Sequence, residues 1–145
     1  MHYKNYKGYF FSEKFPDPEQ IFKKNIKECL STKTEYNFIN NDFRKVDYNN
    51  IGKYNIYLFD GPHHFEDHFD GITLVQPALT DKYILIVDDW NWDQVRNGTA
   101  EAIEELKLKV ISKLEIRTTH DGSNALMMGK DSDWHQGYCF FVIEK

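Results

Sequence analysis

The fold is decided by residues 54–92, which read YNIYLFDGPHHFEDHFDGITLVQPALTDKYILIVDDWNW. This stretch contains two short apolar runs, residues 56–59 and 83–87, and each run leads directly into acidic residues. Between them, residues 65–79 have apolar residues near helical spacing and a proline close to the end. A strand, a turn, a helix and a second strand in this order predict a parallel pair. The ligand site of such a sheet lies beyond the carboxyl ends of its strands.

Three carboxylates stand at those two strand ends. Asp60 follows the first apolar run, and Asp88 and Asp89 follow the second. Clustered acids repel one another unless a cation or a shared proton lies between them. The sequence therefore predicts an acid-lined site at one edge of the sheet.

The bulk properties narrow the class of protein. The chain has 145 residues and a formal net charge of −5, so we expect a single domain over residues 1–145. No basic face is visible, which argues against nucleic-acid binding. No apolar run approaches the roughly 20 residues of a membrane span. Cys29 and Cys139 lie far apart in the chain and favour two unpaired, buried thiols in the cytoplasm.

The rest of the chain alternates between segments with helical spacing and segments with strand character. The predicted helices are residues 16–31, 65–79 and 95–106. The predicted strands are residues 36–39, 53–59, 82–87, 108–118 and 137–143, with a loop over 120–133. The nearly continuous apolar character of residues 82–87 is typical of a strand covered on both faces. This order predicts an α/β layered domain.

Two motifs carry a resemblance to a known family. Asp60-Gly61-Pro62-His63 and Asp88-Asp89-Trp90-Asn91-Trp92, at this separation, resemble class I S-adenosylmethionine-dependent methyltransferases. The closest likeness is to the group called methyltransferase family 24, which includes sugar and natural-product O-methyltransferases. Residues 22–26, 40–43 and 134–138 resemble further segments of that fold. The resemblance implies a three-layer Rossmann-like sheet, mostly parallel with an antiparallel last strand.

The resemblance also implies a metal site. In metal-dependent relatives the matching positions, here Asp60, Asp88 and Asp89, hold a divalent cation. Hard oxygen ligands suit Mg²⁺, which lowers the pKa of a bound substrate hydroxyl. His63 or His64 would then accept the hydroxyl proton. The alternative is that Asp60 and Asp88 cap the helices that follow them and that Asp89 is merely solvated.

Cofactor contacts are implied at two further places. In the resembling family an acid or amide after the third strand binds the adenine amino group, which here is Asp42, with Phe43 against the ring. Asp60 would also border S-adenosylmethionine. The alternative for Asp42 is an ordinary turn aspartate, since Asn-Asn-Asp is common turn chemistry.

Three residues after the second strand are candidates for substrate binding. Trp90 lies in a predicted loop, where exposed aromatic side chains often form the wall of a binding site. Asn91 is its neighbour and Arg96 follows on the next helix. Arg96 either contacts the substrate or pairs with a nearby acid.

One expected motif is missing. Methyltransferases of this class begin with a strand and a glycine-rich turn that lets the backbone approach the cofactor, and this chain has no Gly-x-Gly. We therefore expect an N-terminally truncated sheet that binds S-adenosylmethionine weakly or not at all, either as a fragment or as a reduced relative. The exposed strand edges of such a sheet would need a second copy or a partner chain to cover them.

Three functions remain open from the sequence. The first is a methyltransferase-like domain acting on a hydroxyl of a sugar or small metabolite. The second is a non-enzymatic binding or assembly module that keeps the fold. The third is a metal-dependent α/β hydrolase built on the same acids.

Overall fold

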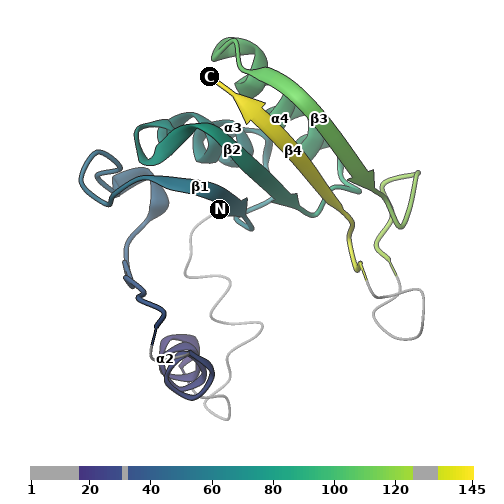
Figure 1. Cartoon of the computed structure of the whole chain (residues 1–145). Helices are drawn as coiled ribbons and strands as arrows, with labels where there is room; N and C mark the ends of the chain where they lie inside the picture. The colour runs from purple at the N-terminus through teal and green to yellow at the C-terminus, as the bar shows by residue number, and fades with distance from the viewer. Residues whose placement is uncertain (1–16, 31–32, 126–133) are drawn as a thin grey trace. The chain divides into compact units, whose positions relative to one another are not determined.

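The computed structural model describes residues 17–30, 33–125 and 134–145. The chain divides into two compact units, residues 1–39 and residues 40–145, and each is described by itself (Figure 1).

In the first unit, the described residues form helix α2, Pro18–Cys29, and the segment after it. Asp17 caps α2 by accepting a hydrogen bond from the Glu19 amide at 3.0 Å, which confirms the predicted helix start. The strand predicted over residues 36–39 is wrong, because these residues are not in a strand and pair with none of the strands in the described part of the chain. Instead the Phe38 ring packs on the Phe22 ring of α2, with centroids 5.2 Å apart.

The second unit contains a four-stranded sheet. Its strands are β1 (Tyr54–Phe59), β2 (Leu79–Asp88), β3 (Lys109–Ile116) and β4 (Tyr138–Glu144), in the order β1-β2-β4-β3. β1 and β2 are parallel, and β4 is antiparallel to both of its neighbours (Figure 1). An α/β fold with an open mixed sheet and an antiparallel last strand is therefore confirmed.

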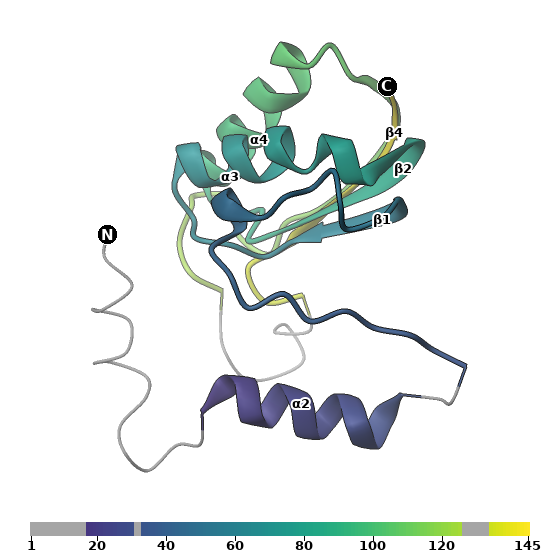
Figure 2. The ribbon, with the colours of Figure 1, turned by 90° about the vertical axis from the view of Figure 1, so that its left-hand side faces the viewer.

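Helices α3 (Phe65–Leu74) and α4 (Asp93–Glu105) lie together on one face of this sheet (Figure 2). The helix predicted over residues 65–79 ends five residues earlier, because Pro77 lies in a short 3₁₀ turn, Gln76–Ala78. Leu79 is consequently the first residue of β2, which begins before the expected residue 82. The helix predicted over residues 95–106 is confirmed, with a start at Asp93.

The two faces of the sheet differ in burial. Along β2, Leu85 and Val87 are fully buried beneath the helices, whereas Ile84, the residue before Leu85, is 38% exposed. The expectation that this strand is covered on both faces is therefore wrong. The strand register joins the outward side chains into two rows, Ile56–Ile84–Val142 and Leu58–Ile86–Phe140–Leu114. The third layer of the expected architecture stays a prediction.

Both cysteines are unpaired; Cys139 is buried in β4 as expected, but Cys29 is exposed. Among the described residues, no helix combines the length and the apolar character needed to cross a membrane.

Candidate metal and substrate site

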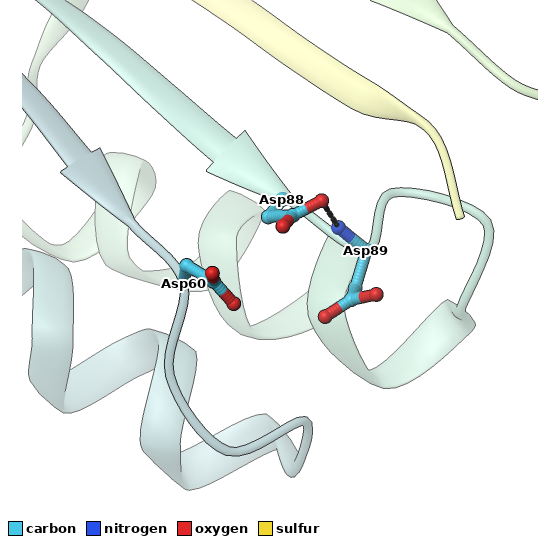
Figure 3. A group of neighbouring side chains, drawn as sticks. All are labelled: Asp60, Asp88 and Asp89. Atoms are coloured by element: carbon cyan, nitrogen blue, oxygen red, sulfur yellow. Dashed lines mark hydrogen bonds between the residues drawn. The ribbon is translucent and has the colours of Figure 1, made fainter. Parts of the chain in front are cut away.

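The parallel pairing of β1 and β2 brings the three acids together. Phe59 pairs with Val87, so the residues that follow leave the sheet side by side. Carboxylate oxygens of Asp60, Asp88 and Asp89 all lie within 4.8 Å of one another (Figure 3). The predicted convergence of these acids at one edge of the sheet is confirmed.

The alternative roles for these acids do not fit the structure. The residues that cap α3 and α4 are His64 and Trp92, so neither Asp60 nor Asp88 is a helix cap. Asp89 is only 8% exposed and is therefore not a solvated surface acid.

The backbone at Asp89 explains how two successive acids face one site. Successive side chains of a strand point to opposite faces, so a regular strand would separate them. Asp89 leaves the strand with a φ of 57°, a left-handed conformation that aspartate tolerates better than most residues. Its amide then donates a 2.7 Å hydrogen bond to the Asp88 carboxylate, drawn as the dashed line in Figure 3. The turn is thus built around the carboxylates that it presents.

The electrostatics show that the acids are short of compensating charge. Partial desolvation of its carboxylate, followed by the negative charge of Asp89, raises the pKa of Asp60 above its ordinary value, against a lowering by His63. The pKa of Asp88 is also raised, first by burial and then by the charges of Asp89 and Asp60. The Asp89 amide and the Tyr138 hydroxyl oppose this shift by hydrogen bonding to Asp88. A cation at the cluster would remove the repulsion.

His63 is the histidine that joins the site. Its Nε2 lies 2.6 Å from Asp89 Oδ2, and its ring meets the Trp92 ring at a centroid distance of 4.3 Å. His64 instead occupies the exposed N-cap of α3. Tyr138 was missed by the sequence analysis, and its pairing with Asp88 across β2 and β4 could have been found only from the strand register.

The donor set fits a hard divalent cation. Opposite oxygen ligands of Mg²⁺ lie about 4.2 Å apart, and those of Ca²⁺ about 4.6–5.2 Å apart. The carboxylate oxygens lie within 4.8 Å of one another, which is inside the Ca²⁺ range. They would need to move only slightly closer together to bind Mg²⁺. Asp60 is exposed and can move, whereas Asp89 is held by His63.

The predicted substrate residues have internal partners. Trp90 is only 3% exposed and packs on Phe141, so the expectation of an exposed aromatic wall there is wrong. Asn91 is fully buried, and its side chain bonds the Thr118 hydroxyl at 2.7 Å and the Thr118 amide at 3.0 Å. A direct substrate contact by either residue has no support in this geometry.

Arg96 holds the same turn from α4. Its guanidinium donates to the carbonyls of Trp90 and Asn91, at 2.7 and 2.5 Å, and pairs with Asp93. The alternative of pairing with a nearby acid is therefore confirmed, and a substrate role for Arg96 stays a prediction.

The predicted cofactor residues also have local roles. Asp42 caps the 3₁₀ turn Phe43–Lys45 by accepting from the Arg44 amide at 3.0 Å. The Phe43 ring packs on Phe59 with centroids 5.4 Å apart. These contacts match the turn interpretation of Asp42, and binding of adenine at this pair stays a prediction.

A hollow of about 420 Å³ opens beside the acid cluster. We call it the crevice. Its lining consists of His63, His64, Trp92, Asp93, Gln94, Asp121 and Gly122. Asp121 belongs to the predicted loop after β3, where no sequence signal marked it as a site residue.

Comparison with known proteins adds no family. No protein-family model matches the chain, and no curated protein matches it significantly.

Proposed function

We propose that residues 40–145 form the metal- and substrate-binding part of an S-adenosylmethionine-dependent O-methyltransferase-like domain, acting on a hydroxyl of a sugar or small metabolite. The observation that carries the proposal is the convergence of Asp60, Asp88 and Asp89 at the carboxyl ends of a parallel strand pair. The absence of helix-capping roles for Asp60 and Asp88 supports a ligand role.

The chain's own residues divide the work at such a site. A bound divalent cation would lower the pKa of a substrate hydroxyl. Asp89 is oriented by His63, and Asp88 by the Asp89 amide. With the His63 Nε2 proton shared with Asp89, Nδ1 is the nitrogen that accepts the hydroxyl proton.

The methyl donor rests on the resemblance of the two acidic motifs, supported by the antiparallel last strand. The residues present do not fit the donor's usual cradle, because the chain has no Gly-x-Gly turn. We therefore expect the isolated chain to bind S-adenosylmethionine weakly or not at all. Micromolar binding in a calorimeter would contradict this expectation.

Thermal unfolding with increasing Mg²⁺ or Mn²⁺ tests the metal site. At a metal concentration 100 times the Kd, we expect about 2.7 kcal/mol of added stability. Asp60→Asn should abolish the response, whereas Asp81→Asn, at the other end of β2, should retain it. An unchanged melting temperature in the wild type, or an equal response in Asp60→Asn, would overturn the proposal.

A second candidate function is an assembly module. It is favoured by the open apolar face, where Ile56, Leu58 and Leu114 are 56, 52 and 60% exposed. Sedimentation of the wild type and of Leu58→Lys distinguishes the two cases. A concentration-dependent oligomer that dissociates in the variant would favour assembly.

A further inference from the structure

The crevice has an unbalanced charge. No Lys or Arg lines it within residues 17–30, 33–125 and 134–145. Arg96 lies nearby, but its guanidinium donates to two carbonyls and pairs with Asp93. The charges of Arg96 and Asp93 therefore offset each other. Asp121 has no such partner in the lining. Asp121 is exposed and, like an ordinary aspartate, carries its charge at neutral pH; hydrogen bonds from Ser123 lower its pKa further.

The acid cluster adds to this negative potential from behind His63. Asp89 touches His63 directly, and Asp60 and Asp88 lie within 4.8 Å of Asp89. A divalent cation would offset only two of these three charges. Where His63 and His64 are neutral, the crevice therefore remains negative with or without the metal, and an anionic ligand is repelled in both states.

The apolar wall of the crevice is the Trp92 side chain. Its ring is half-buried and is fixed edge-on by the His63 ring at 4.3 Å. Tryptophan attracts the C–H face of a saturated ring, and it also attracts ammonium groups over its π-system. The wall thus suits a compact ring compound that is not itself negatively charged.

We infer that the crevice takes a hydroxylated ring compound that is neutral or carries an amine, and that it rejects phosphorylated and carboxylated analogues. This inference rests on the proposed function in one respect, since the hydroxyl to be activated enters by this crevice.

Three probes of one ring size test the selection. Glucosamine, glucose and glucose 6-phosphate are titrated into the full chain with saturating Mg²⁺ at about pH 7.2, where ordinary imidazoles are mostly neutral and the amine of glucosamine is mostly protonated. Saturation-transfer NMR gives the affinities. We expect glucosamine to bind about fivefold more tightly than glucose, and glucose 6-phosphate to bind most weakly. Binding of the phosphate at least as tight as that of glucose, or no binding of any probe, would overturn the inference.

Two variants locate the effect. Asp121→Asn should reduce the preference for glucosamine over glucose to about twofold, because the acid cluster remains, while the matched Asp81→Asn leaves it unchanged. Trp92→Ala should weaken all three probes together. An unaltered preference in Asp121→Asn would contradict the inference.

The same titration without Mg²⁺ separates this inference from the proposed function. Retention of the order of the probes in a protein that shows no metal response would leave the charge selection standing and remove the metal site. A metal response without any preference among the probes would leave the metal site standing and remove the charge selection.

Discussion

The turn after β1, residues 60–64, and the turn after β2, residues 89–92, begin alike and are built differently. Each turn follows an apolar strand and starts with an acid of the cluster, Asp60 in the first and Asp89 in the second. In the second turn Asp89, Trp90 and Asn91 are all buried. In the first turn Asp60 and His64 are exposed. The second turn is a fixed scaffold, and the first supplies the ligand that can adjust.

Hydrogen bonds account for the difference. The amides of Trp90 and Asn91 donate to the carbonyls of Gly137 and Gln136 at 3.1 and 2.8 Å, which ties the second turn to the residues before β4. The His64 amide of the first turn has a longer bond, 3.4 Å, to the Asp67 carboxylate. A rigid ligand pair beside a movable third ligand is a useful arrangement for a metal that must also admit a substrate.

The largest predicted effect is the loss of the Asn91 side chain. Asn91→Ala removes a fully buried side chain and leaves the part-buried amides of Thr118 and Thr119 without their shared acceptor, which should cost about 3 kcal/mol of unfolding free energy. His64→Ala, in the exposed turn, should cost less than about 0.5 kcal/mol. Urea unfolding measures both values, with the exposed Asn97→Ala as the matched asparagine control. Equal losses of unfolding free energy in Asn91→Ala and His64→Ala would contradict the difference between the two turns.

The next effect concerns His68 on α3, the helix after the first turn. Its ring is 1% exposed, and both nitrogens lack hydrogen-bond partners among the described residues. Burial first, and then the His63 charge, lower the pKa of His68 to about 4. Between pH 6.5 and about 4 the unfolded chain therefore binds a proton that the folded chain does not.

Stability should consequently fall as the pH drops through that window, by up to about 3 kcal/mol. His68→Gln should flatten the curve, whereas His120→Gln, at an exposed position, should not. Chemical denaturation at stepped pH measures the slope. The same slope in wild type and His68→Gln would contradict this assignment.

A smaller effect is expected at Gly98, which sets the spacing of the helices behind the two turns. A Cβ at this position would lie 2.3 Å from the Phe65 carbonyl oxygen, a backbone atom that cannot yield easily. Gly98→Ala should therefore destabilise the protein by about 2 kcal/mol, despite the better helix propensity of alanine. The exposed Glu101→Ala on α4 serves as the control. A gain in stability at residue 98 would show that the helices can separate without cost.

The smallest predicted effect is a gain in stability when the Asp60 charge is removed. The raised pKa of Asp60 means that protonation stabilises the folded state, and this stability is lost as the pH rises from 3.8 through the folded pKa. In EDTA at neutral pH, Asp60→Asn should therefore raise the melting temperature slightly. Asp70→Asn removes an acid paired with Arg44 and should lower it. Differential scanning calorimetry measures both, and a loss of stability in Asp60→Asn would contradict the electrostatic account.

The sequence predicted the strand ends well because their signal is local. The apolar runs before Asp60 and Asp88 gave the parallel pair, and the acids marked the site. The burial of Trp90 and Asn91 could not be predicted, because it depends on Phe141, Thr118 and Gln136, which are distant in the chain.

The two errors in strand prediction have a related cause. Residues 36–39 have strand-like composition but pair with none of the described strands, and Phe38 instead packs on Phe22. Residues 82–87 look apolar enough for two covered faces, yet α3 and α4 cover only one. Composition indicates which segments are apolar enough to form a strand. Which segment they pack against, and on how many faces, depends on tertiary contacts.

The most direct test of the account is an anomalous diffraction map from crystals soaked in Mn²⁺, which takes the same oxygen ligands as Mg²⁺. We predict a single strong peak about 2.0–2.3 Å from carboxylate oxygens of Asp60, Asp88 and Asp89, and no peak in Asp60→Asn crystals. A map without a peak at these three carboxylates, in crystals that diffract well enough to show one, would contradict the metal site.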